Sequence, residues 1–147
     1  MKKRLDAYRI FLIFQGGSAF FYRLVFTVNM FFYVDKVELN ALQLILVGTA
    51  LEGAVFLCEI PTGIVADVYS RRLSVIIGTL ITGIGFLLSA IPVFGIILIG
   101  QATWGVGYTF ISGAIQAWIT DEIGEEAANR AFLRVAQIDQ GFTIVGL

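Results

Sequence analysis

Residues 59–75 read EIPTGIVADVYSRRLSV. The stretch contains a carboxylate, a proline, a glycine, an aspartate and two arginines, and it lies between two long runs of mostly apolar residues. A helix needs about 20 apolar residues to cross the hydrocarbon layer of a membrane. The runs on both sides reach that length, so the stretch has the composition of a short polar connection between two membrane spans.

The composition of the whole chain is that of a membrane protein. Of its 147 residues, 58% are hydrophobic and 14% are charged, whereas soluble domains carry about 25% charged residues. The net charge of −1 provides no basic field for nucleic acid. The chain has no histidine and one cysteine, which excludes disulfide frameworks, Cys/His metal sites and histidine-dependent catalysis. We therefore expect no enzyme activity, no cofactor and no nucleic-acid partner.

The distribution of apolar residues predicts an all-α polytopic membrane protein. Four segments are long enough to span a membrane, at about 10–34, 42–66, 73–91 and 93–119. The polar stretch 120–134 is predicted as a helical linker on the cytoplasmic side, with Gly124 as the stop of the fourth span. A fifth helix is predicted to start at 135 and to occupy 135–147.

Basic residues predict the orientation of these spans. If consecutive spans alternate in direction, eight of the ten basic residues fall on one side: Lys2, Lys3, Arg4, Arg9, Arg71, Arg72, Arg130 and Arg134. Loops rich in Lys and Arg stay in the cytoplasm. We therefore expect a multi-pass protein of the cell membrane with a cytoplasmic N-terminus.

Three charged residues lie inside the predicted spans: Arg23, Glu52 and Glu59. A charge at the centre of a membrane helix costs about 2.5–3.5 kcal/mol. Ionisable residues at that depth are functional candidates by default. The alternative for Arg23 and Glu52 is structural, because the two side chains can pair across the first two spans.

Helical periodicity sorts the remaining polar residues onto particular faces. One face of the first span carries Gln15, Ser18, Tyr22, Phe26, Asn29 and Tyr33. One face of the fourth carries Gln101, Gly105, Tyr108, Thr109, Ser112 and Gln116. The third carries only Ser74, Gly78, Gly85 and Ser89. We expect the first and fourth spans to face water or a ligand and the third to be scaffold.

Helix packing is the competing interpretation of these faces, because small and hydroxyl residues permit close helix contacts. It is favoured for the residues that recur every four positions, Gly105, Thr109, Gly113 and Ala117. For Gln101 and Gln116 the structural and functional interpretations carry equal weight.

The segment GIVADVYSRR, residues 63–72, resembles the signature loop between helices 2 and 3 of the major facilitator superfamily. The matching residues are Gly63, Ala66, Asp67, Arg71 and Arg72. Val65, Val68 and Ser70 depart from the pattern, replacing a leucine, a basic residue and a glycine. The segments EIPTG and AWITDE also look like bacterial members of this superfamily, notably drug-efflux types of the inner membrane.

This resemblance implies the N-terminal part of a transporter with two six-helix halves, here helices 1 to 4 and the start of helix 5. Substrate would bind near mid-membrane between the halves, and Asp67, supported by Arg71, would latch them together. The implied partners are the lipid bilayer, a small-molecule substrate, protons and a second half absent from this chain. The candidate pathway residues are Arg23, Asn29, Glu52, Glu59, Gln101 and Gln116.

The expected function is that of a secondary active transporter that exports small amphipathic compounds by alternating access. Gln101, in QATWG, stands where proton-driven antiporters of the superfamily often have arginine, which leaves Glu52 and Glu59 as candidate proton carriers. The alternative is a small helical membrane protein that acts as a scaffold or subunit without transport of its own. Four spans and part of a fifth cannot form two halves, so we expect a piece of a longer protein.

Overall fold

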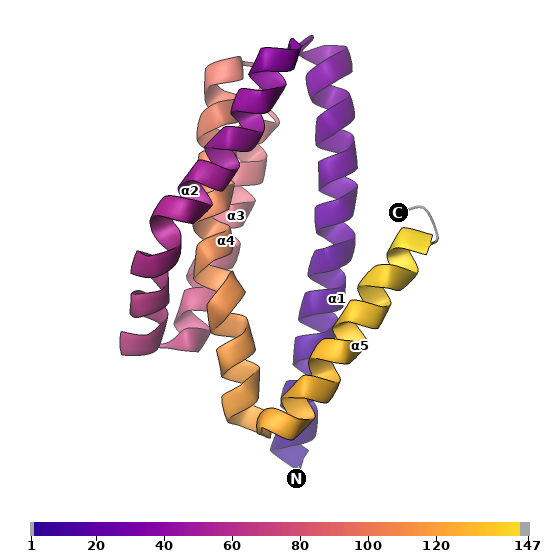
Figure 1. The fold of residues 1–147 in the computed structure, drawn as a ribbon, viewed down its shortest axis with the longest axis vertical. Coiled ribbons are helices and arrows are strands. Elements are labelled where there is room, and N and C mark those ends of the chain that lie inside the picture. Colours follow the sequence, from indigo (N-terminus) through magenta and orange to yellow (C-terminus); the bar gives the residue numbers. More distant parts are fainter. Residues whose placement is uncertain (1, 145–147) are drawn as a thin grey trace. The chain divides into compact units, whose positions relative to one another are not determined.

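The computed structural model describes the backbone of residues 2–144 and the side chains of residues 7–141. These residues form helices and no strand. The elements are α1 (Lys2–Phe31), the π-helical turn η1 (Phe32–Lys36), α2 (Ala41–Val68), α3 (Arg71–Ser89), α4 (Phe94–Ile123) and α5 (Glu125–Ile144) (Figure 1). The predicted all-α fold is confirmed.

Four of the helical segments are long and apolar enough to cross a membrane. They are Ala7–Lys36, Ala41–Val68, Arg71–Ser89 and Phe94–Ile123. A helix rises about 1.5 Å per residue, so 20 residues cover the roughly 30 Å of hydrocarbon. The structure therefore contains four helical segments that match the four predicted spans in length and composition.

Local side-chain chemistry fixes where these helices begin. Asn40 precedes α2, and its Oδ1 accepts from the backbone N of Gln43 at 3.0 Å. The Gln43 side chain accepts in return from the Asn40 backbone N at 2.9 Å, which completes a capping box. Ser70 precedes α3, and its Oγ accepts from the backbone N of Leu73 at 3.3 Å. Both caps satisfy backbone donors that a helix start leaves open.

Gly124 separates α4 from α5. Its φ of +84° lies in the left-handed region, which glycine enters without steric cost and which ends the helix. The stretch 120–134, predicted as a helical linker, is helical on both sides of Gly124. From Glu125 the helix continues without a break to Ile144.

The chain divides into two compact units. The first combines 1–28 with 116–147, and therefore contains most of α1, the last turns of α4, and α5. The second is 29–115, which contains η1, α2, α3 and most of α4.

In the second unit, α3 and α4 approach each other through small residues. A Cβ added to Gly85 would lie 2.6 Å from the backbone N of Trp104, and one added to Gly78 would lie 2.6 Å from the backbone O of Gly107. Ser74 Oγ also donates to the backbone O of Phe110 at 2.8 Å. These contacts leave no room for larger side chains and agree with the prediction that the third span is scaffold.

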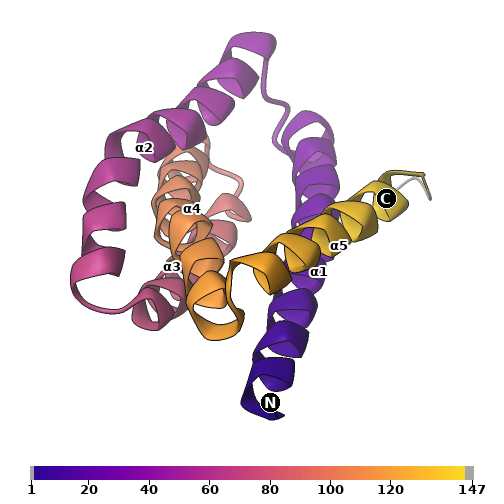
Figure 2. The same ribbon diagram turned by 60° about the horizontal axis from the view of Figure 1, so that its bottom comes forward.

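Helix α2 contacts α4 at Gly105, where an added Cβ would lie 2.6 Å from the backbone O of Leu51. The predicted packing role is confirmed for Gly105, whereas Gly113 has no described atom within 4 Å of such a Cβ. Pro61 lies inside α2 and has no N–H to donate to Leu57. Figure 2 shows α2 as a curved helix, the shape that an interior proline favours.

In the first unit, α1 and α5 run in the same direction. The Phe11 and Phe132 rings meet edge to face at 5.7 Å between centroids. Further along both helices, Gly16 lies against Ile138, and Arg23 bonds Asp139. Phe11 is fully buried, as are Ala128 and Ala131 on α5. The two helices are therefore held together by apolar packing near their N-terminal ends and by an ion pair nearer their C-terminal ends.

Candidate functional site

The junction of α2 and α3 carries the residues of the predicted loop motif. Asp67 lies in the last turn of α2 and Arg71 is the first residue of α3. Arg71 Nη2 lies 3.5 Å from Asp67 Oδ1, at the outer limit of a hydrogen bond. The Asp67 side chain is 69% exposed, so this pair adds little stability and leaves the carboxylate accessible to another group.

Of the remaining three motif residues, Ala66 is buried and the other two are exposed. Gly63 is exposed, and no described atom lies within 4 Å of a Cβ built on it. Arg72 is exposed at the start of α3. The junction therefore presents the exposed charges of Asp67 and Arg72 beside a glycine that another segment can approach closely.

Helix α2 carries two exposed carboxylates inside its apolar segment. Glu52 and Glu59 are seven residues apart, two helical turns, and therefore share one side of α2. Among the described side chains, 7–141, neither carboxylate has a hydrogen bond or ion pair. Gly48 and Gly63 lie on the same side and also face open space in the described structure. We name the side defined by Gly48, Glu52, Glu59 and Gly63 the open face of α2.

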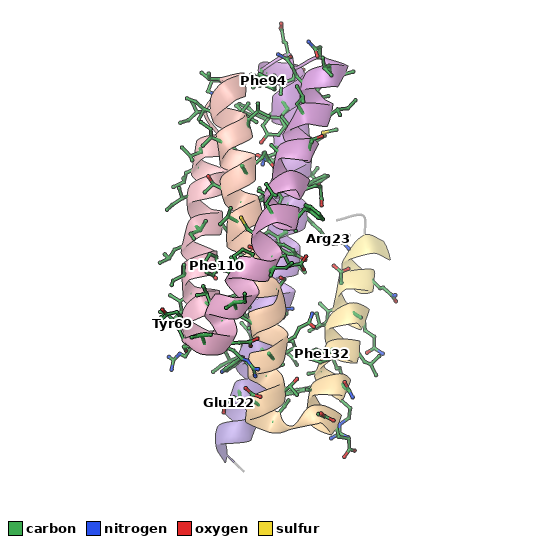
Figure 3. The ribbon with its side chains drawn as sticks, turned by 60° about the vertical axis from the view of Figure 1, so that its left-hand side comes forward. Arg23, Tyr69, Phe94, Phe110, Glu122 and Phe132 are labelled. Atoms are coloured by element: carbon green, nitrogen blue, oxygen red, sulfur yellow. The ribbon has the colours of Figure 1, made fainter. Side chains whose placement is uncertain are left out.

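Arg23 has a carboxylate partner that the sequence did not indicate. Its Nε and Nη2 donate to Asp139 Oδ1 at 3.2 and 3.0 Å. Figure 3 shows Arg23 beside α5, the helix that carries Asp139 and Phe132. Glu52, the partner considered from the sequence, belongs to the second unit, so its pairing with Arg23 stays a prediction. Asp139 lies in the predicted fifth helix, and a carboxylate there is a signal that would have marked it as a candidate.

Gln101 lies in a buried hydrogen-bond network. Gln101 is 5% exposed. Its Nε2 donates to Tyr33 Oη at 3.0 Å and to Ser89 Oγ at 3.4 Å. The network ties α4 to η1 and to the end of α3. This arrangement favours the structural interpretation of Gln101, because burial of its amide is offset by bonds to other helices.

The remaining two candidates differ in exposure. Gln116 is exposed on α4. The Nδ2 atom of Asn29 is buried, with no hydrogen-bond partner among the described residues. A buried donor without a partner costs about 1–3 kcal/mol, so Asn29 is a polar group poised for an acceptor.

Comparison with known proteins gives one distant similarity. Over 125 residues, 83% of this chain, the sequence is 25% identical to YxaM, an uncharacterized MFS-type transporter of Bacillus subtilis strain 168. The chain spans 31% of the length of that curated relative. No family model matches the chain, and no solved structure matches it. The chain is therefore a multi-pass membrane protein that resembles part of an MFS-type transporter.

Proposed function

We propose that the chain is the N-terminal part of a secondary active transporter that exports small amphipathic compounds by alternating access. The observation that carries this proposal is the similarity to an MFS-type transporter over 83% of the chain. Four helices of spanning length support it, as does the set of charged groups placed along them. In this proposal the substrate meets the candidate residues near mid-membrane, between this part and a second half.

The α2–α3 junction supports a latch between the two halves. Asp67 is exposed and only weakly bonded to Arg71. A carboxylate in that state is available to a donor on another bundle, where a charge-assisted hydrogen bond is stronger than the 3.5 Å contact it has here. In this proposal the junction lies on the cytoplasmic side, as the distribution of basic residues predicts, and the latch closes that side while the other is open.

The open face of α2 supports a role in the pathway. Glu52 and Glu59 are exposed in a helix that otherwise suits lipid, and charged groups at that depth face a cavity or a partner rather than acyl chains. Each is a candidate carrier for the proton that would drive export. The same exposure is consistent with contact to the second half of the transporter.

Transport assays on the complete natural protein that carries this sequence test the proposal. Inside-out vesicles with an imposed pH gradient should accumulate fluorescent amphipathic dyes, and a protonophore should abolish the accumulation. Absence of gradient-driven transport of both anionic and cationic dyes, with correctly inserted protein, would contradict the proposed function.

Asp67→Asn tests the latch within the same assay. The substitution removes the charge but keeps the shape, so we expect the transport rate to fall about tenfold or more while expression and insertion stay near wild type. Arg130→Gln, which removes a basic residue of the exposed α5 pair with Glu126, is the matched control and should leave the rate unchanged. An unchanged rate in Asp67→Asn would sink the latch assignment.

A further inference from the structure

We propose that η1 and the turn that follows it, residues 32–39, form a strap that opens and closes over Gln101 while the α3–α4 contact stays intact. The strap belongs to the second unit and lies at the end of α2 opposite the α2–α3 junction (Figure 1). The inference goes beyond the proposed transport function and does not depend on it. It starts from the contacts that hold the strap and from the backbone features that oppose them.

One side of the strap holds it closed. Tyr33 and Leu39 are buried and pack with Val47 of α2 and Ile97 of α4 in one apolar cluster. The Tyr33 hydroxyl also accepts a hydrogen bond from Gln101 Nε2 at 3.0 Å. Closure therefore removes the Tyr33 and Leu39 side chains from water and covers the amide of Gln101.

The backbone conformation of the strap is unfavourable. Val37 N donates to Phe32 O at 3.0 Å, which closes a π-helical turn, a rare geometry that is frequent at functional sites. Glu38 has a φ of +56°, in the left-handed region that disfavours residues with a Cβ. Such a backbone persists only where the surroundings impose it. The contacts of Tyr33 and Leu39 must therefore offset its cost.

Two further features favour an open state. Asn29 lies one helical turn before Tyr33, and its buried Nδ2 has no hydrogen-bond partner among the described residues. An open strap would admit water to this donor and remove the cost of burying it unpaired. On the outer side of the strap, Asp35 and Lys36 are exposed and pair with each other, so this ion pair does not anchor the strap to another helix.

These opposing contributions make the strap a two-state element. The closed state satisfies the Gln101 amide through Tyr33 and Ser89. The open state exposes that amide and the Tyr33 hydroxyl to water or to a ligand at this end of α4. A local opening needs less free energy than global unfolding, because the rest of the core stays packed.

Amide hydrogen exchange in the purified complete protein tests the strap. The reporters are Leu39 N, which donates to Tyr33 O at 2.9 Å, and Val37 N. The reference amides are those of Thr82 and Gly85, in the part of α3 that packs against α4. We expect the reporters to exchange about 100-fold faster than the references, after correction for intrinsic rates, because the strap opens locally.

Gly78→Ala separates local opening from global unfolding. Its new Cβ would lie 2.6 Å from Gly107 O, at the α3–α4 contact. The closed and the open strap share this contact, so exchange at Leu39 should keep its wild-type rate, whereas exchange at Thr82 should become about tenfold faster. If Gly78→Ala does not fold, Ser74→Ala, which removes a hydrogen bond to α4, is a milder variant with the same expected pattern.

Two substitutions within the strap should shift its equilibrium in opposite directions. Tyr33→Phe keeps the ring and removes the nearer of the two acceptors of Gln101, so exchange at Leu39 should become about tenfold faster. Glu38→Gly relieves the left-handed backbone, so exchange at Leu39 should become about fivefold slower. Glu38→Ala, which removes the carboxylate but keeps the Cβ, is the matched control and should stay near wild type.

Equal acceleration of Leu39 and Thr82 in Gly78→Ala would overturn the proposal, because the strap would then open only when the whole protein unfolds. Unchanged exchange at Leu39 in both Tyr33→Phe and Glu38→Gly would also overturn it. The measurement needs no substrate and is separate from the vesicle assay. A strap that opens locally in a protein that transports no dye would remove the proposed function and leave this inference standing.

Discussion

The α3–α4 contact and the open face of α2 use the same residue, glycine, in opposite ways. On α3 and α4, a Cβ added at Gly78, Gly85, Gly100 or Gly107 would fall within 3 Å of an atom of the other helix. On α2, a Cβ added at Gly48 or Gly63 would meet no described atom within 4 Å. One surface is closed by a neighbour, and the other has no neighbour among the described residues.

The difference shows which parts of the second unit are built to stay together. Where the backbone of one helix lies against a glycine of another, the two helices pack at close range, as at buried helix contacts in membranes. The open face of α2 instead combines accessible glycines with Glu52 and Glu59. A surface with that chemistry suits a partner that binds reversibly, as the proposed alternating access would require.

Breaking the closed surface should have the largest effect. In Gly85→Ala the new Cβ would lie 2.6 Å from the backbone N of Trp104 and 2.8 Å from the backbone O of Gly100. Backbone atoms cannot rotate away, so the helices must separate. We expect a loss of about 1–3 kcal/mol in unfolding free energy, the usual cost of overpacking. Thermal and denaturant unfolding of the purified protein measure it.

The matched control lies on the open face. Gly48→Ala adds the same methyl group where no described atom is within 4 Å, and alanine favours a helix over glycine by about 1 kcal/mol. Its unfolding free energy should therefore stay level or rise slightly. Equal destabilisation by both substitutions would erase the distinction between the two surfaces.

Removing the hydrogen bonds of Gln101 should destabilise the protein less than Gly85→Ala. Gln101→Leu removes the donor to Tyr33 Oη and Ser89 Oγ, both of which are buried. The expected loss is about 1 kcal/mol of unfolding free energy, measured beside Gln116→Leu, whose exposed side chain should matter little. A Gln101→Leu protein of full stability and no transport would reassign Gln101 to the pathway.

The hydropathy of the sequence and the residues that end helices were sufficient to predict much of the fold. The apolar runs predicted four spans, and the structure has four helices of that kind. Gly124 ends α4 as predicted, because its backbone conformation disfavours other residues. The small-residue face of the third span, from Ser74 to Ser89, is buried as a scaffold face should be.

Contacts between segments that are far apart in the chain could not be predicted from the sequence. Arg23 and Asp139 are 116 positions apart, and no local pattern indicates which of several carboxylates the arginine meets. Gly63 and Gly78 are both helical glycines in apolar surroundings, yet of the two only Gly78 has a described neighbour at its surface. Gln101 lay on a polar face that suited a pathway, and its bonds to Tyr33 and Ser89 depend on how the helices assemble.

The most direct test of the account is the water accessibility of the open face of α2. In a Cys58→Ser background of the complete protein, Glu52→Cys is treated with a membrane-impermeant maleimide, beside Leu57→Cys on another side of the same helix. We predict labelling of Glu52→Cys that an amphipathic substrate slows, and no labelling of Leu57→Cys. Failure to label Glu52→Cys in membranes, or equal labelling of both positions, would contradict the account.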